Sequence, residues 1–284
     1  MLMSEADEVA ATISDYLVTR YGFNKECKVL RCTGDNPATL VGMSCRDQDL
    51  ILSLGTSDVL IGVSGHVTPS PDIHVFCNPL NSNSHMFIIC YKNGSLVREE
   101  LKDKYCGGEW ERYNQMLSTQ DNPPLVGNYL PLPETCPAGL VGAFCSTDPE
   151  RLPLSHPPET IVRTVTEGQF LSKRHDISAA GFKPTSNTRL IVVGGGSVNN
   201  TLLNLISNVF GVDVYRASSA NAAARGAALL AFAGVNGVGR MEELRTEYEL
   251  VSKTNPELYH TYCGMRENYV DLQKEYLYSS LHKE

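Results

Sequence analysis

The chain has 284 residues, of which 42% are hydrophobic and 20% are charged, a composition that is normal for a globular protein. Its net charge of −8 argues against nucleic acids and anionic membranes as main partners, because both are themselves negatively charged. The charge does not exclude ATP, since phosphates can be bound by a few local backbone N–H groups.

The amino-terminal segment is expected to be helical. Apolar residues recur on one helical face over residues 4–20, and Gly22 supplies a stop. A short strand is predicted over residues 27–32, followed by a helix over residues 37–43 for which Asn36 is a suitable N-cap. The chain starts directly in an amphipathic pattern, with no strand or loop before it. We therefore expect that the amino-terminal part of a longer protein is missing.

The next segment predicts a β-hairpin over residues 49–65, because two apolar runs flank a turn at residues 55–58. A third strand is expected over residues 86–91, and helices over residues 96–104 and 110–117.

A proline-rich stretch at residues 121–160 lacks strong periodicity and is expected to be a long connection with short strands around residues 139–144. A helix is predicted over residues 160–174, and the charged tail from residue 241 onward is predicted to be helical.

The last third of the chain shows the clearest pattern. The expected order is strand, glycine turn, helix, strand and helix, over residues 189–193, 194–197, 200–210, 212–215 and 222–232. Gly211 suits the end of the first of these helices, and Gly234 the end of the second. Strands and helices that alternate at this short spacing predict parallel strand pairing with right-handed crossovers.

The nine cysteines include no Cys-x-x-Cys pair, so the sequence predicts no metal-ligating residues. An odd number of cysteines without a signal sequence is typical of reduced thiols, and we expect a cytoplasmic protein. No run approaches the roughly 18 apolar residues of a membrane-spanning helix.

Two turns could bind an anion. The glycine run at residues 194–196 leads from a strand into a helix, which lets backbone N–H groups approach a nucleotide closely. The hairpin turn offers Gly55, Thr56 and Ser57, whose hydroxyls and N–H groups could hold a terminal phosphate. Each turn could instead be an ordinary tight turn without a ligand.

Three single residues are also ambiguous. Asp35 lies between a predicted strand and a predicted helix, so it could accept a proton from a substrate hydroxyl or simply cap the helix. Trp110, the only tryptophan, could line an adenine pocket or fill a core. Gly226, inside a predicted helix, indicates close backbone packing or room for a nucleotide. Their order along the chain is more specific than any one of them.

That order resembles the second half of the FGGY carbohydrate kinases, a branch of the actin-like ATPases, and especially the members that act on xylulose. The resemblance runs from about residue 13 to residue 232. The segments that carry it are TGDNPA at residues 33–38, SLGTSD at 53–58, FCNP at 76–79, KNGSL at 92–96, EGQF at 167–170, and GGGS at 194–197 with Asn199.

The resemblance implies a role for each candidate residue. Asp35 would be the general base, and Asp35 and Asn36 would bind the sugar. The residues implied to bind ATP are Gly55, Thr56, Ser57, Trp110, Gly195, Gly196 and Asn199. The family's early Gly-x-Asp-x-Gly-Thr hairpin, which belongs to an amino-terminal domain, has no counterpart near the start of this sequence. Only the second domain is therefore expected here.

The implied fold is an α/β, ribonuclease H-like (actin-like ATPase) domain, in which helices flank a mixed sheet. We expect a segment inherited from the interdomain region at residues 1–26, the nucleotide-binding kinase domain at 27–238 and a helical tail at 239–284. The implied activity is ATP- and Mg²⁺-dependent phosphorylation of a ketose, foremost D-xylulose at O5. The alternatives are a kinase for glycerol or another pentulose, and a non-catalytic nucleotide-binding fragment.

Overall fold

The computed structural model describes residues 8–31, 33–79, 81, 83–119, 125–147, 156–217, 221–237 and 244–281. These residues form two compact units. The first unit combines residues from the ranges 1–46, 77–84 and 217–248, and the second combines those from 47–76, 85–216 and 249–284.

The second unit is built on a mixed seven-stranded sheet with the order β11-β10-β9-β3-β4-β6-β5. The strands are β3 (Leu50–Leu54), β4 (Asp58–Ser64), β5 (His74–Cys77), β6 (His85–Tyr91), β9 (Leu190–Val193), β10 (Val214–Ala217) and β11 (Tyr248–Ser252). The predicted hairpin is confirmed, because β3 and β4 pair antiparallel. The predicted parallel pairing is also confirmed, since β9 pairs parallel with both β10 and β3.

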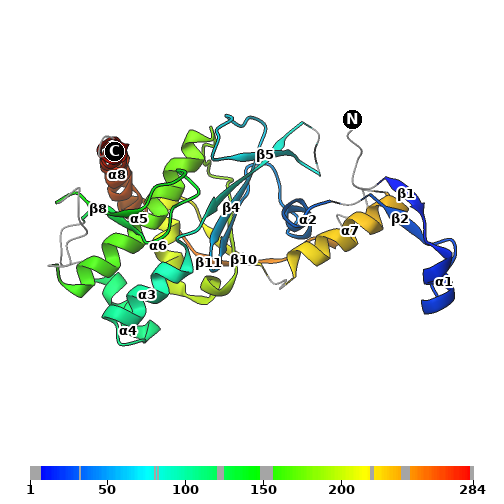
Figure 1. Cartoon of the computed structure of the whole chain (residues 1–284), viewed down its shortest axis with the longest axis horizontal. Helices are drawn as coiled ribbons and strands as arrows, with labels where there is room; N and C mark the ends of the chain where they lie inside the picture. Colours follow the sequence, from blue (N-terminus) through cyan, green and yellow to red (C-terminus); the bar gives the residue numbers. More distant parts are fainter. Residues whose placement is uncertain are drawn as a thin grey trace. The chain divides into compact units, whose positions relative to one another are not determined.

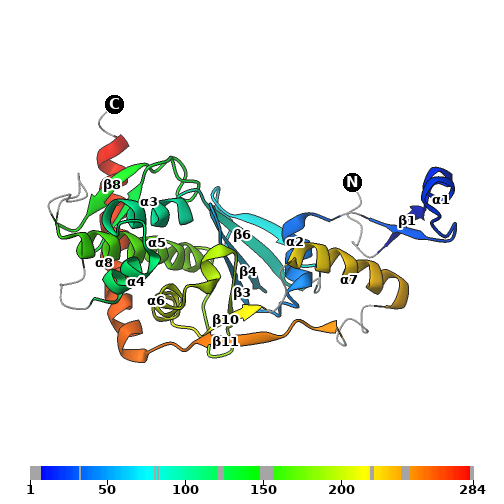
Figure 2. The same ribbon diagram turned by 90° about the horizontal axis from the view of Figure 1, so that it is seen from below.

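Five helices lie on the same side of this sheet in both views (Figures 1 and 2). They are α3 (Ser95–Tyr105), α4 (Trp110–Ser118), α5 (Pro158–Ala179), α6 (Asn200–Phe210) and α8 (Pro256–Leu281). A separate antiparallel pair, β7 (Gly127–Leu130) with β8 (Gly142–Cys145), lies within the connection that was expected to hold short strands.

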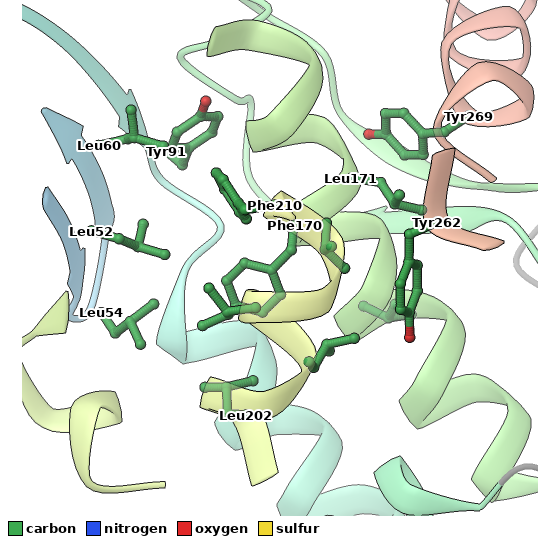
Figure 3. Packing of buried hydrophobic residues seen from close by; sticks show 14 of the residues in the cluster. Leu52, Leu54, Leu60, Tyr91, Phe170, Leu171, Leu202, Phe210, Tyr262 and Tyr269 are labelled. Carbon is green, nitrogen blue, oxygen red and sulfur yellow. The ribbon is translucent and has the colours of Figure 1, made fainter. Parts of the chain in front are cut away.

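The main hydrophobic core fills the space between sheet and helices. Alternate residues of β3, such as Leu52 and Leu54, point toward Phe170 of α5 and Phe210 of α6 (Figure 3). All four are almost fully buried. The burial of these side chains supplies most of the driving force that fixes α5 and α6 against the sheet.

The first unit contains β1 (Val9–Thr12), α1 (Asp15–Tyr21), β2 (Lys28–Leu30), α2 (Asp35–Gly42) and α7 (Ala222–Asn236). Helices α2 and α7 lie side by side (Figure 1). Their backbones touch: a Cβ on Gly226 would lie 1.7 Å from the Ala38 carbonyl oxygen, and one on Gly42 would lie 1.9 Å from that of Ala222. The close-packing interpretation of Gly226 is therefore confirmed.

We expect Gly226→Ala to lower the free energy of unfolding by about 1–3 kcal/mol or more, because the added methyl group meets backbone that cannot rotate away. Gly264→Ala is the matched control. Gly264 is also helical, but a Cβ there meets nothing within 4 Å, so the control should be neutral or stabilising. Urea unfolding of both variants checks this, and equal behaviour of the two would contradict it.

Several element boundaries differ from the prediction. The helix predicted over residues 4–20 is wrong for Val9–Thr12, which forms β1, and is confirmed for residues 15–20, which lie in the helix Asp15–Tyr21. β1 pairs antiparallel with β2, and this tertiary pairing overrides the local helical pattern. Residues 4–7 lie outside the described residues.

The ends of the two helices in the first unit also differ. Helix α2 begins at Asp35, with Gly34 rather than Asn36 at the N-cap. Helix α7 continues past Gly234 to Asn236 and ends before Gly237, whose φ is +87°.

The sequence did not predict β5, nor β11 within the tail that was expected to be helical. Both are outer strands of the sheet, where the apolar pattern is weak because one edge has no neighbouring strand.

Candidate active site

The two predicted anion-binding turns lie next to each other at one edge of the sheet. β3 and β9 run parallel, with Ser53 opposite Val193, so the turn after each strand emerges at the same carboxyl edge. Thr56 and Ser57 are exposed there. In open α/β sheets this edge is where ligands bind. The structure therefore brings the hairpin turn and the glycine run together.

Two of the three glycines of the run pack closely on Leu54, and the middle one does not. Gly194 has a φ of +85°, and a Cβ on it would lie 2.7 Å from the Leu54 carbonyl oxygen. A Cβ on Gly196 would lie 2.8 Å from the Cβ of Leu54. A Cβ on Gly195 would meet nothing within 4 Å. The outer two glycines let the run pack on the hairpin, while the space beside Gly195 is free for a ligand.

Asn199 links the glycine run to α4. Its Oδ1 accepts a hydrogen bond from the Leu202 N–H at 3.1 Å, which caps α6, and its Nδ2 donates to Asn114 Oδ1 at 2.8 Å. Trp110 lies one turn before Asn114 on the same helical face. Its side chain is 42% exposed, so it does not fill a core. The tryptophan is thus available for contact with a ligand beside the glycine run.

A buried ion cluster of Asp58, Arg98 and Lys173 supports the hairpin turn at its carboxyl end. Asp58, the first residue of β4, is fully buried and accepts two hydrogen bonds from Arg98, at 2.9 and 3.0 Å. Lys173 Nζ lies 3.2 Å from the same carboxylate. Burial would raise the pKa of Asp58, but Arg98 and Lys173 outweigh it and hold that pKa below its usual value. Asp58 is therefore ionised beneath the turn.

A second turn, at residues 92–95, packs against the hairpin turn. The Ser95 N–H donates to the Gly55 carbonyl at 3.0 Å, and a Cβ on Gly94 would lie 2.6 Å from the Asp58 nitrogen. The Gln169 side chain donates to the carbonyls of Asn93 and Gly94, at 2.7 and 3.2 Å. The backbone of Gly55 is therefore fixed before any ligand arrives.

Sequence reasoning assigned no role to the residues of this support. Asp58, Asn93, Gly94 and Gln169 lie inside the segments that carry the family resemblance, which was the available signal. Arg98 and Lys173 lie outside those segments. Nothing in the local pattern distinguishes them from the charged residues of an exposed helix face.

Asp35 and Asn36 belong to the first unit. Asp35 is exposed in the first turn of α2, and its Oδ1 accepts a hydrogen bond from the Asn36 N–H at 2.8 Å. It lines a hollow of about 320 Å³ with Arg31 and Thr33, opposite an apolar wall of α7. Because Gly34 is the N-cap, Asp35 is not the helix cap that the alternative interpretation required.

The profile of the FGGY family of carbohydrate kinases, C-terminal domain, matches residues 50–235. The chain belongs to the FGGY family of carbohydrate kinases. It is 33% identical to the xylulose kinase of Rattus norvegicus over 276 residues, which is 95% of this chain and 51% of that protein. It is 38% identical to xylulose kinase 2 of Arabidopsis thaliana over 248 residues, 82% of this chain and 44% of that protein.

Solved structures show the same fold for this FGGY chain. The xylulose kinase of Rhodospirillum rubrum matches with a TM-score of 0.80 at 17% identity, over 99% of this chain and 57% of that chain. The glycerol kinase of Plasmodium falciparum with ADP matches with a TM-score of 0.70 at 16% identity, over 94% of this chain and 55% of that one. The FGGY chain thus spans about half the length of the relatives that it matches.

In the described part of the FGGY chain, no helix combines the length and apolarity needed to cross a membrane. Likewise, the described residues hold no group of three or more His, Cys, Asp or Glu side chains that could bind a metal ion.

Asp176, a buried residue of α5 close to Lys173, should make the free energy of unfolding depend on pH. Burial raises its pKa to about 7, although its Oδ2 accepts a hydrogen bond from the Tyr91 hydroxyl at 2.9 Å. The folded state therefore binds a proton more tightly than the unfolded state, whose Asp pKa is about 3.9. Stability from this group is complete below about pH 4 and is lost as the pH rises to about 7, a change of about 4 kcal/mol.

We expect Asp176→Asn to remove most of this dependence. Chemical unfolding at pH 5 and pH 8 of both proteins is the measurement, and the wild-type chain should lose more stability between these pH values than the variant. Parallel losses in the two proteins would show that Asp176 does not titrate in this range.

Proposed function

We propose that this chain is the nucleotide-binding half of an ATP-dependent kinase that converts D-xylulose to D-xylulose 5-phosphate. The observation that carries the proposal is that two turns suited to binding an anion lie next to each other at the carboxyl edge of β3 and β9. The hairpin turn exposes the hydroxyls of Thr56 and Ser57, and the glycine run leaves open space beside Gly195. The names of the relatives point to xylulose as the sugar. The assignment of residues 27–238 to the kinase domain, with 1–26 from the interdomain region and 239–284 as a tail, belongs to this proposal.

ATP would bind across the two turns. The N–H groups and hydroxyls of Gly55, Thr56 and Ser57 would contact the phosphates, because exposed turn donors can cradle an anion. Gly195, Gly196 and Asn199, with Trp110 beside them, would contact the adenosine. The open space at Gly195 and the exposed Trp110 ring fit this role. Mg²⁺ would neutralise phosphate charge and be held largely by phosphate oxygens, as is usual for this ion.

Asp35 would act as the general base. It would take the proton from the O5 hydroxyl as O5 attacks the γ-phosphorus, while the bond from that phosphorus to the bridging oxygen breaks and ADP leaves. Asn36 would help to hold the sugar. Phosphoryl transfer depends mainly on positioning and charge stabilisation, so the fixed backbone of Gly55 matters as much as the base.

Two alternatives remain. A glycerol kinase is among the structures with the same fold, so another polyol or pentulose could be the acceptor. The second alternative is a nucleotide-binding module without activity, which binding of ADP without turnover would favour. We also propose a cytoplasmic location, because the described cysteines are all free thiols.

ADP titration followed by Trp110 fluorescence tests the nucleotide half of the proposal, since Trp110 is the only tryptophan. We expect saturable quenching by ADP and slow ADP release from ATP with D-xylulose. Glycerol and D-ribulose, assayed in parallel, decide the acceptor. Binding without turnover would favour the module, and the absence of binding would reject the nucleotide site itself.

A further inference from the structure

A second hollow, of about 370 Å³, lies on the second unit, and no residue of the hairpin turn or the glycine run lines it. Its walls are the carboxyl end of α4, one face each of α5 and α6, and the first turns of α8. This volume falls in the range of small-molecule sites, about 300–1,000 Å³. The proposed phosphoryl transfer makes no use of it.

The floor of the hollow carries a buried carboxylate. Glu167 is 2% exposed, and its Oε1 accepts hydrogen bonds from Arg163 Nε and from the Tyr262 hydroxyl, each at 2.8 Å. Its Oε2 has no hydrogen-bond partner among the described residues. Burial raises the pKa of Glu167, although Arg163 opposes the shift. Such a group in a concave site is costly unless something satisfies it, which makes it a candidate for ligand binding.

Packing contacts explain why the two residues after Glu167 are glycine and glutamine, but they do not explain Glu167. Gly168 is glycine because a Cβ there would lie 1.8 Å from the Gly127 carbonyl oxygen, and Gln169 braces the turn at residues 92–95. Glu167 shares their resembling segment but contacts neither turn of the nucleotide site.

The chemistry of the hollow selects the class of ligand. Glu167 and Arg163 form an ion pair, so the floor carries no net charge and favours a neutral molecule. The rim combines amides and hydroxyls, which both donate and accept hydrogen bonds. Those rim residues are Thr201, Asn204, Asn208 and Thr261. Three leucines complete the wall and can pack against C–H groups: Leu117, Leu205 and Leu258.

We infer that this hollow binds a small neutral polyol or sugar at its rim, and that binding shifts the Glu167 side chain so that a ligand hydroxyl donates to Oε2, which is closed off from solvent in this structure. Hydroxyl groups, unlike ammonium or carboxylate groups, match both the neutral floor and the mixed rim. The site is separate from the hollow of Asp35, which belongs to the first unit.

Xylitol titration of the ¹⁵N-labelled chain, followed by amide chemical shifts, tests the inference. We expect saturable shifts at Thr119, Thr201 and Thr261 in the millimolar range. Thr261→Trp is the blocking variant, because Thr261 is exposed and a large ring there should close the hollow without disturbing the fold. Asp35→Asn is the matched control for binding at the other hollow, and it should leave these shifts intact.

Glu167→Gln should weaken xylitol binding roughly tenfold, because the amide keeps the shape but not the charged acceptor. The inference is overturned if the wild-type amides of the hollow do not shift, if their shifts survive Thr261→Trp, or if Asp35→Asn abolishes them. ADP quenching of Trp110 is measured on the same samples, so failure of the nucleotide site would be recognised separately.

Discussion

Asp58→Asn should lower the free energy of unfolding by about 3–5 kcal/mol, the usual cost of breaking a buried ion pair by removing one partner. The side chains of Arg98 and Lys173 are each 2% exposed, and Asp58 is the carboxylate that both contact. Without it two cations remain buried close together. Because Asp58 directly follows the hairpin turn, we also expect ADP binding to weaken. Urea unfolding and Trp110 fluorescence measure the two effects.

Asp103→Asn is the matched control for this substitution. Asp103 pairs with Lys102 at 2.6 Å, but its side chain is 66% exposed, so the loss should stay below about 1 kcal/mol. Arg98→Lys separates charge from geometry, since lysine keeps the charge but loses the two-pronged hydrogen bonding to Asp58. An Asp58 variant as stable as the Asp103 variant would show that the cluster does not support the turn.

Asp35→Asn should reduce sugar-dependent ADP release about 10²–10⁴-fold, the usual contribution of a general base. The amide cannot take the proton from the attacking hydroxyl, although it can still accept the hydrogen bond from the Asn36 N–H. ADP binding should not change, because the proposed ATP contacts all lie in the second unit. The rate is measured as ADP released from ATP with D-xylulose as the acceptor.

Asp15→Asn provides the comparison for Asp35. Asp15 is likewise an exposed aspartate in the first turn of a helix of the first unit, but it lies on α1 and outside the hollow. Its replacement should leave turnover unchanged. Near-normal turnover of the Asp35 variant would falsify the assignment of the base, while the nucleotide site would remain independently supported by ADP binding.

Local patterns alone determined the elements that frame the proposed nucleotide site. The hairpin of β3 and β4 follows from two apolar runs around a hydroxyl-rich turn, and α6 matches its predicted range, with Gly211 at a φ of +71° after it. These features depend on side-chain direction along one segment, which repeats every two residues in a strand and every 3.6 in a helix. The family resemblance added the expected roles of Asp35 and of the two turns.

Tertiary structure alone decided what supports those turns. The ion cluster joins Asp58 on β4 to Arg98 on α3 and Lys173 on α5, and each is an ordinary charged residue within its own segment. In the same way, Val9–Thr12 becomes a strand because β2 pairs with it. Such features depend on hydrogen bonds between segments that are distant in the sequence. The periodicity of side chains along one segment carries no information about which distant segment will contact it.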